Sequence, residues 1–332
     1  MQPVKWGILS TANIGWRKVV PAMLRSSEIA VVAVGSRKLE TARAMADELG
    51  IPRAYGSYEE LLADPEIEAV YNPLPNHLHV PLTLQAAEAG KAVLCEKPIA
   101  MTAEEAEQLK DAAGKVLIAE AFMIRHHPQW QEARRLVRSG ELGTLRSINL
   151  TFAYTNLDPD NVRNKADIGG GGLLDIGCYA VVTGRYLFDA EPLRVIALIE
   201  RDPTFRTDRN ASVLLDFGES RQMTFTCSTQ TAPCQHVRVN GTKARLEILT
   251  PYNAPPDTAT ALVLDDGSQL GGASARRIEI PAADQYRLQA EAFGRALRKG
   301  EPNEYGLVDA LDTMRVLDAI VRSERSGHWE AP

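Results

Sequence analysis

The sequence has few cysteines and no long apolar run. Its four cysteines are Cys95, Cys178, Cys227 and Cys234. They are widely spaced and form no CxxC motif, which argues against a disulfide framework or a zinc site and is typical of a reducing cytoplasm. No apolar stretch reaches the roughly 18 residues that a membrane-spanning helix needs. These absences predict a cytoplasmic protein that does not span a membrane.

Acidic residues outnumber basic residues, 43 to 37. The chain of 332 residues carries a formal net charge of -6 and no run of Lys or Arg, so it lacks the basic surface with which proteins bind nucleic acids. The first residues lead directly into the strand-like run Val4–Leu9, which leaves no room for an export signal. The composition, 45% hydrophobic and 24% charged, is that of a globular protein long enough for two well-buried domains.

Short apolar runs alternate with helical stretches at the start of the chain. Alternating strands and helices build a parallel sheet with helices on its faces. We therefore expect a Rossmann-type α/β domain, a doubly wound parallel sheet, over residues 1–122. The expected strands are 4–9, 29–35, 69–72, 92–95 and 116–119, and the expected helices are 14–26, 39–49, 58–63, 79–89 and 102–113.

Segments rich in β-formers dominate the rest of the chain, residues 123–332. This pattern predicts an α+β domain with a mostly antiparallel sheet. The expected strands are 145–154, 194–200, 211–217, 222–229, 235–240, 244–248 and 261–264, and the expected helices are 129–139, 173–187, 284–299 and 306–325.

The turn after the first expected strand is similar to a dinucleotide-binding fingerprint. The three positions of the G-x-G-x-x-G pattern hold Ser10, Ala12 and Gly15. Small residues still let a pyrophosphate approach the backbone N–H groups at the start of the helix. An ordinary strand–helix turn would select small residues too, but the place of this turn between the first strand and the first helix favours a nucleotide site.

The second expected strand ends without the acidic residue that NAD-binding domains use for the ribose 2′-OH. Ser36, Arg37 and Lys38 stand there instead. The hydroxyl and the backbone N–H groups can donate to a 2′-phosphate, and the guanidinium can pair with it or stack on the base. We therefore predict NADP as the cofactor, with a solvated surface loop as the alternative.

Residues suited to hydride transfer follow in both expected domains. Lys97 stands between a strand end and a proline, and Asp175 and Tyr179 share one helix face after the glycine run 169–172. Oxidation of a carbinol needs an acceptor for the hydroxyl proton, and a tyrosine beside a lysine can serve because the cation favours the phenolate. Each residue also has a structural interpretation, Tyr179 as a helix-face aromatic and Asp175 as an early-helix charge.

Four histidines lie in the segments near these residues. His77, His79, His126 and His127 form no HExxH pattern and accompany no cysteine cluster. We therefore expect no metal site.

With these motifs the chain resembles the Gfo/Idh/MocA-type oxidoreductase family over its whole length. The resemblance rests on Pro75-Asn76-x-x-His79, on Glu96-Lys97-Pro98 and on the segment 120–128. The run 169–179 is similar to the branch with glucose-fructose oxidoreductase, dimeric dihydrodiol dehydrogenase and xylose dehydrogenases.

The resemblance implies roles and a substrate class. Lys97 is expected to assist proton transfer and to contact the nicotinamide ribose, and Tyr179 to act as the acid/base. A tyrosine at position 179, where inositol dehydrogenases have histidine, favours aldoses such as xylose or glucose, or anhydro-sugars. The resemblance also implies a homodimer, or a dimer of dimers, formed through an open-faced C-terminal sheet.

We therefore predict an NADP-dependent oxidoreductase that acts on a small polyhydroxylated substrate. Two alternatives stay open, a trans-dihydrodiol or dicarbonyl oxidoreductase and a non-catalytic NADP-binding regulator. The predicted catalytic residues are Lys97, Tyr179 and Asp175, and the predicted substrate contacts are Lys97, Tyr154, Arg163, Asp175 and Tyr179. The predicted cofactor contacts are Ser10, Thr11, Ala12, Ile14, Ser36, Arg37, Lys38, Pro73, Leu74, Asn76, His79, Glu96, Lys97 and Arg125.

Overall fold

The computed structural model describes residues 2–300 and 303–332. Its internal contacts divide the chain into two compact units. Unit 1 comprises Met1–Met123 and Gln285–Leu311, and unit 2 comprises Ile124–Asp284 and Asp312–Pro332. No helix in the described ranges is both long enough and apolar enough to cross a membrane.

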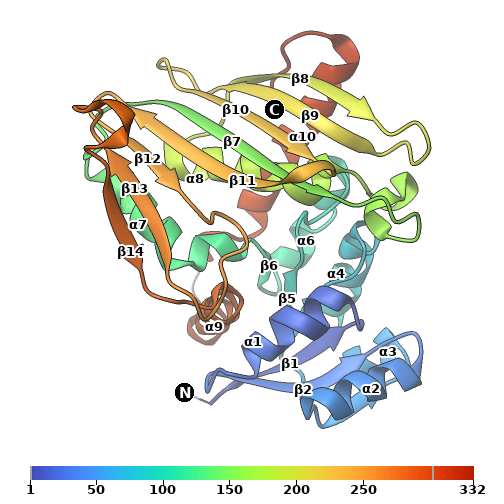
Figure 1. The fold of residues 1–332 in the computed structure, drawn as a ribbon. Coiled ribbons are helices and arrows are strands. Elements are labelled where there is room, and N and C mark those ends of the chain that lie inside the picture. Colours follow the sequence, from blue (N-terminus) through green and yellow to red (C-terminus); the bar gives the residue numbers. More distant parts are fainter. Residues whose placement is uncertain (1, 301–302) are drawn as a thin grey trace. The chain divides into compact units, whose positions relative to one another are not determined.

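Unit 1 contains the expected parallel sheet, which Figure 1 draws in blue and cyan. Six parallel strands run in the order β3-β2-β1-β4-β5-β6. The order turns back between β1 and β4, and open α/β sheets bind ligands at such a switch point. The strands are β1 (Val4–Leu9), β2 (Ile29–Gly35), β3 (Arg53–Tyr55), β4 (Ala69–Asn72), β5 (Ala92–Cys95) and β6 (Ile118–Glu120).

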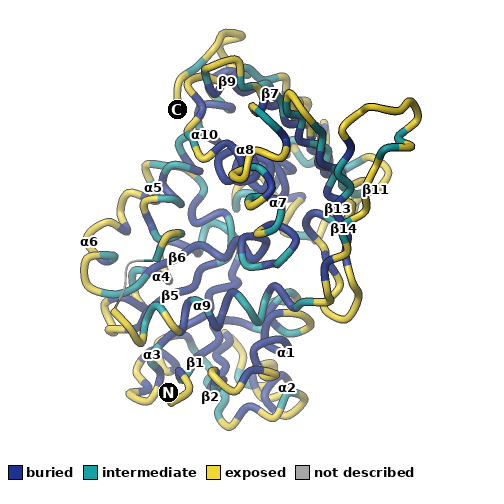
Figure 2. The backbone as a smooth tube through the Cα atoms, turned by 90° about the vertical axis from the view of Figure 1, so that its left-hand side faces the viewer, coloured by how far each residue is buried: buried dark blue, intermediate teal, exposed yellow. Residues whose placement is uncertain are grey.

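The helices of unit 1 connect these strands. They are α1 (Val20–Met23), α2 (Leu39–Leu49), α3 (Tyr58–Leu62), α4 (His79–Glu88), α5 (Ala103–Glu107), α6 (Lys110–Ala113) and, from near the C-terminus, α9 (Gln285–Lys299). The central strands β4 and β5 are buried at every residue, and Figure 2 shows them as dark-blue tube. Strands buried on both faces are typical of a parallel sheet covered by helices.

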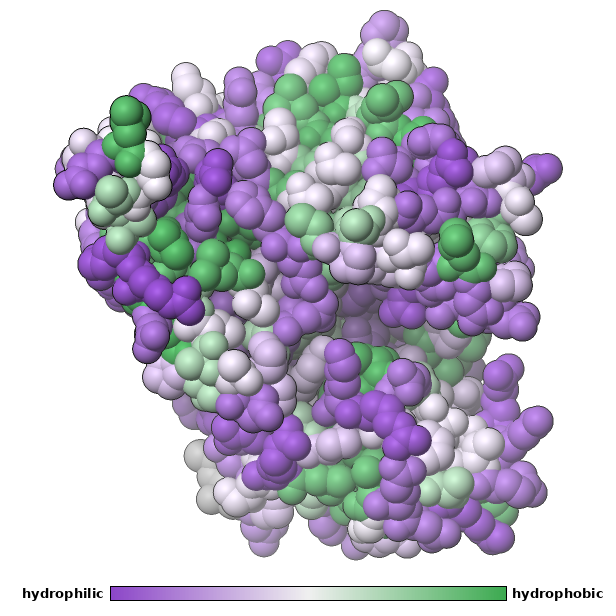
Figure 3. Space-filling view, viewed as in Figure 1, coloured by the Kyte–Doolittle hydropathy of each residue, from purple (hydrophilic) through white to green (hydrophobic). Residues whose placement is uncertain are grey.

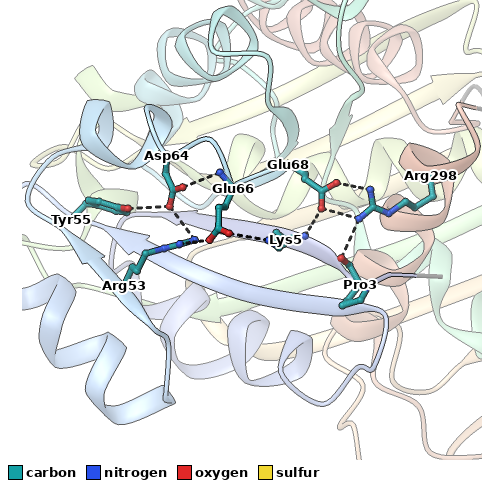
Figure 4. Close-up of polar contacts among 8 residues, drawn as sticks. All are labelled: Pro3, Lys5, Arg53, Tyr55, Asp64, Glu66, Glu68 and Arg298. Carbon is teal, nitrogen blue, oxygen red and sulfur yellow. Dashed lines mark hydrogen bonds and ion pairs between the residues drawn. The ribbon is translucent and has the colours of Figure 1, made fainter.

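Helix α9 belongs to unit 1, although the sequence predicts it within a second domain over residues 123–332. Its Phe293 ring lies 5.2 Å from the ring of the fully buried Trp6 in β1. Arg298 at its end bonds the Glu68 carboxylate at 2.8 Å and the Pro3 carbonyl at 3.1 Å, as Figure 4 shows. Packing against β1 therefore places α9 in unit 1. Local sequence patterns carry no information about such long-range contacts.

Unit 2 is built on an eight-stranded sheet in the order β14-β13-β12-β11-β7-β10-β9-β8. Only the β10–β7 pair is parallel, which agrees with the expected mostly antiparallel sheet. The strands are β7 (Leu145–Thr155), β8 (Arg194–Arg201), β9 (Asp208–Asp216), β10 (Gln222–Ser228), β11 (Gln230–Gly241), β12 (Arg245–Ile248), β13 (Thr260–Asp265) and β14 (Arg276–Ile280).

Helices cover one face of this sheet. They are α7 (Pro128–Arg138), α8 (Cys178–Phe188) and most of α10 (Leu307–Ser326). The turn Leu173–Gly177, which has π-helical hydrogen bonding, leads directly into α8. The buried core on this face includes Phe152, Val213 and Phe225.

The opposite face of the sheet carries mainly polar side chains near its centre. Asn149 in β7 bonds the Thr224 hydroxyl in β10 at 2.8 Å, and Asn240 in β11 bonds the Ser147 hydroxyl at 3.0 Å. At the β8 edge, Leu198 is 77% exposed. Figure 3 shows hydrophilic and hydrophobic residues side by side over this part of the molecule. The face is therefore mixed in character.

Candidate functional site

The turn after β1 has the backbone form of a dinucleotide-binding turn without its first glycine. Ser10 adopts a positive φ of 85°, a region that glycine enters more easily than serine. Its N–H donates to the Gly35 carbonyl at 2.8 Å, and its hydroxyl accepts from the Ala12 N–H at 3.2 Å. A Cβ added at Gly15 would lie 3.5 Å from the Pro73 ring, so this turn and the loop after β4 are neighbours at the switch point.

The end of β2 gathers hydroxyl groups. The Ser36 hydroxyl is buried and lies 2.9 Å from the Thr41 hydroxyl, which donates to the Lys38 carbonyl at 2.8 Å. Arg37 is exposed beside them. Sequence reasoning missed Thr41, although a hydroxyl in the first turn of the following helix was a signal that could have found it. This set of hydroxyls with a cation suits a phosphate group.

The loop after β4 is held by Asn72 and His79. Asn72 is fully buried, and its amide donates to the His79 carbonyl at 3.2 Å and accepts from the Leu74 N–H at 3.3 Å. The His79 ring is 1% exposed, with one nitrogen 2.7 Å from the Pro98 carbonyl oxygen and the other 2.6 Å from that of Leu74. Both ring nitrogens therefore face carbonyl oxygens of the protein, and the predicted contact of His79 with a cofactor stays a prediction.

These bonds also fix the backbone on both sides of Lys97. Glu96 accepts from the Tyr71 hydroxyl at 2.6 Å, and the Ile99 N–H donates to the Glu120 carboxylate at 2.7 Å. Burial and the Glu96 charge raise the pKa of Tyr71 well above its ordinary value, so this hydroxyl remains a donor. The segment that carries Lys97 is thus anchored before and after the lysine, at the carboxyl edge of the parallel sheet.

In unit 2 the predicted substrate residues gather around Asp175. Its Oδ2 atom accepts from the Tyr154 hydroxyl at 2.6 Å and from Arg163 Nε at 2.8 Å. Burial, followed by the Asp175 charge, raises the pKa of Tyr154. Asp175 chiefly raises the pKa of Arg163, with smaller contributions from Tyr154 and Tyr179. The structure therefore brings all four predicted side chains of unit 2 into one electrostatic cluster.

Aromatic packing holds Tyr179 in place. Its ring lies 5.7 Å from the Phe152 ring, edge to face, and 5.1 Å from the Tyr252 ring. Tyr252 is fully buried, and its hydroxyl lies 3.2 Å from the Thr183 hydroxyl in the same helix as Tyr179. Such contacts restrict the ring to one orientation. Sequence reasoning missed Phe152 and Tyr252, because nothing in the sequence pattern relates them to Tyr179.

The glycine run 169–172 packs closely against other atoms of unit 2. A Cβ at Gly170 would lie 2.6 Å from the carbonyl oxygens of Arg163 and Lys165, and the N–H groups of Gly170 and Gly171 donate to those two carbonyls. The run therefore fixes the loop that presents Arg163 to Asp175.

Two further predicted residues have less defined places. Asn76 begins a short 3-10 turn before α4, and Arg125 is buried at the start of unit 2. Within the described ranges, no group of three or more His, Cys, Asp or Glu side chains is arranged to hold a metal ion.

Models of two families match the chain. The model described as "Oxidoreductase family, NAD-binding Rossmann fold" matches residues 4–117, and the model "GFO/IDH/MocA C-terminal domain" matches residues 130–247. Together they span strands β1 to β5 of unit 1 and most of the sheet of unit 2.

Similar proteins include oxidoreductases of known activity. D-xylose 1-dehydrogenase (NADP(+)) 2 of Haloferax volcanii is 38% identical over 97% of this chain and 98% of its own length. An uncharacterized oxidoreductase of Rhizobium meliloti is 49% identical over 99% of both chains. A 3-ketoreductase from Actinomadura kijaniata, solved in complex with NADP and TDP-benzene, is 28% identical, covers 97% of this chain and 98% of its own, and superposes with a TM-score of 0.90.

The buried ring of His79 predicts a loss of stability in mild acid. Burial lowers the pKa of His79 from 6.5 to about 4, although its two carbonyl contacts oppose the shift. Because this pKa lies below that of the unfolded chain, the neutral ring favours folding fully above pH 6.5, and the contribution is lost as the pH falls towards 4. It amounts to about 3 kcal/mol.

Urea unfolding at a series of pH values measures this contribution. We expect His79→Gln to show a flatter pH dependence of the unfolding free energy than the wild type, whereas the half-buried His77→Gln in the same loop keeps the wild-type dependence. Identical profiles for His79→Gln and the wild type would contradict the assignment.

Proposed function

The chain belongs to the GFO/IDH/MocA family of oxidoreductases, and from this premise we propose that it transfers a hydride between NADP and a CH–OH or C=O group of a small sugar-like substrate. Aldoses such as xylose or glucose, and anhydro-sugars, are the proposed substrates. The observation that carries the proposal is the cluster around Asp175, in which a carboxylate, a guanidinium and two phenols converge.

The residues at the switch point of unit 1 fit a bound NADP. Ser10, Thr11, Ala12 and Ile14 would hold the pyrophosphate at the start of the first helix, where N–H groups favour negative charge. Ser36, Arg37 and Lys38, with Thr41, would hold the 2′-phosphate. When bound, the cofactor accepts or donates the hydride. The proposed contacts on the nicotinamide side are Pro73, Leu74, Asn76, Glu96, Lys97 and Arg125.

Side chains of this protein transfer the proton that accompanies the hydride. During oxidation the hydroxyl proton of the substrate passes to Tyr179. During reduction Tyr179 returns a proton to the carbonyl oxygen. Arg163 supplies positive charge that favours the phenolate, and Asp175 with Tyr154 orients the hydroxyl groups of the substrate. The role proposed for Lys97 is to assist proton transfer. A general acid/base of this kind contributes roughly 100- to 10,000-fold to the rate.

Two further properties complete the proposal. The enzyme acts in the cytoplasm, which agrees with four cysteines that form no disulfide. It associates as a homodimer, or a dimer of dimers, through the face of the unit 2 sheet that its own helices leave uncovered. Support comes from Leu198, which is 77% exposed on β8 beside a field of polar side chains, because interfaces often combine apolar and polar contacts.

Removal of the proposed proton donors should abolish turnover and preserve the fold. We expect Lys97→Ala and Tyr179→Phe each to lower kcat by about 100-fold or more, measured as NADPH formation or consumption with a panel of aldoses, anhydro-sugars, trans-dihydrodiols and diketones. Lys115→Ala, at an exposed position of unit 1, and Tyr186→Phe, on α8, are the matched controls. Wild-type rates in both test variants would refute the assignment.

Cofactor preference should depend on the end of β2. We expect Arg37→Ala to weaken NADPH binding about 10-fold, the effect of losing one charge-assisted contact, and to leave NADH binding unchanged. Ser36→Asp should reverse the preference, because it restores the acid that NAD sites use. Fluorescence titration with both cofactors measures this, and Arg43→Ala on the exposed side of α2 is the control. Tighter binding of NADH than NADPH by the wild type would overturn the role of Arg37.

If the protein associates through this sheet, a single charge introduced on the sheet should lower its mass in solution. An arginine that is buried at this interface without an acidic partner opposes association, so we expect Leu198→Arg to shift the protein towards the monomer in light-scattering chromatography. Leu270→Arg is the control, because Leu270 is 98% exposed in a loop between β13 and β14. A wild-type mass for Leu198→Arg would exclude this face.

A further inference from the structure

A half-buried carboxylate, that of Asp208, lies behind the Asp175 cluster and plays no part in the chemistry proposed above. Asp208 begins β9, and its Oδ2 atom accepts from the N–H of Leu173, the first residue of the helical turn that leads into α8. This turn carries Asp175, and α8 carries Tyr179 in its first turn. Because the first N–H groups of a helix have no partner within it, a carboxylate from another strand can satisfy them.

The glycine run is shaped around this carboxylate. Gly171 has a φ of 118°, and a Cβ added there would lie 1.9 Å from Asp208 Oδ1. A Cβ at Gly172 would lie 3.4 Å from Oδ2. Thus Asp208 contacts the same run whose N–H groups hold the Arg163 loop, and it connects β9 to both parts of the cluster.

Asp208 is a costly residue to keep in its ionised form. Burial raises its pKa from 3.8 to about 6, opposed by the N–H groups of Leu173 and Gly172 and by the Arg201 charge. The other titratable groups that face it are Tyr154 on β7 and Cys227 on β10. Carboxylates with a perturbed pKa cluster at functional sites.

We propose that Asp208 is a positioning residue of the active site, whose ionised carboxylate holds the glycine run and the first helical turn so that Asp175, Tyr179 and Arg163 stay in their working arrangement. The proposal rests on the proposed function for its effect on turnover. Its structural part is independent of any substrate. Protonation of Asp208 replaces an acceptor by an O–H donor that faces the backbone N–H groups, and the turn loosens.

The sign of the pKa shift predicts opposite effects on stability and activity. Because the folded-state pKa lies above 3.8, the protonated form is favoured by folding, so this group opposes folding above pH 6 and ceases to do so as the pH falls towards 4. Asp208→Asn, a neutral residue of the same shape, should therefore keep or raise the Tm at pH 8. A purely structural role for the carboxylate would instead lower the Tm of this variant.

Hydrogen–deuterium exchange of the wild-type protein tests the structural part directly. Peptides that span 170–177 should be protected at pH 8 and lose protection, after correction for intrinsic exchange rates, as the pH falls through 6. In Asp208→Asn their protection should be low at every pH. Asp216→Asn is the matched control, since Asp216 lies on the same strand and pairs with Arg194 at the surface. Wild-type protection that is constant from pH 8 to pH 5 would overturn the proposal.

Turnover tests the functional part. At pH 8 we expect Asp208→Asn to lower kcat by about 10- to 100-fold, the effect of a small displacement of reacting groups, and to remove the acidic limb near pH 6 from the kcat profile. NADPH affinity should stay within twofold of the wild type, because the cofactor residues of unit 1 are distant in the chain and unaltered. Gly171→Ala, whose Cβ would displace Asp208, should reproduce the loss.

The outcomes separate this proposal from the proposed function. A wild type that turns over none of the substrates refutes the proposed function, while the exchange data still decide whether Asp208 holds the turn. An active wild type with unchanged kcat and pH profile in Asp208→Asn refutes the positioning role. A fall in Tm together with kcat would show that the carboxylate only supports the fold.

Discussion

The arrangement of unit 2 depends on one shared carboxylate. Asp175 accepts bonds from Tyr154 on β7 and from Arg163 in the loop after β7, and it lies one helical turn before Tyr179. A charge that receives two such donors is both satisfied and fixed in direction. The helix, the strand and the loop are therefore mutually positioned. The glycine run, the aromatic packing of Tyr179 and the half-buried Asp208 all support this arrangement.

In unit 1, contacts with backbone carbonyls help to hold the loops around Lys97. The parallel strands of this unit end together at the switch point, where loops of neighbouring strands must be held without blocking a ligand. The His79 ring lies between the carbonyls of Leu74 and Pro98 and, when neutral, donates to one of them, and Glu120 accepts from the Ile99 N–H. Through these contacts, buried polar groups hold the backbone on either side of Lys97 in place. Precise placement of reacting groups is the main way in which such a site lowers an activation barrier.

Much of this could be predicted from the sequence, because the central strands are apolar and the site motifs lie at strand ends. The family, the fold class and NADP as cofactor were all predicted in this way. Strands β3 and β14 were missed because each is a short edge strand rich in charged or half-buried residues. Helix α9 was assigned to the wrong unit and Asp208 was overlooked, because their roles arise from contacts between segments that are distant along the chain. Thr41 was overlooked although it lies only five residues after Ser36.

The central claim is that the chain transfers a hydride directly between one carbinol carbon of its substrate and NADP. The most direct measurement uses an aldose deuterated at its reacting carbon together with NADP, followed by mass spectrometry of the reduced cofactor. The account predicts one deuterium in the cofactor for each turnover and none lost to water. Deuterium released to solvent, or a cofactor that binds and acquires no label from any sugar of the panel, would contradict it.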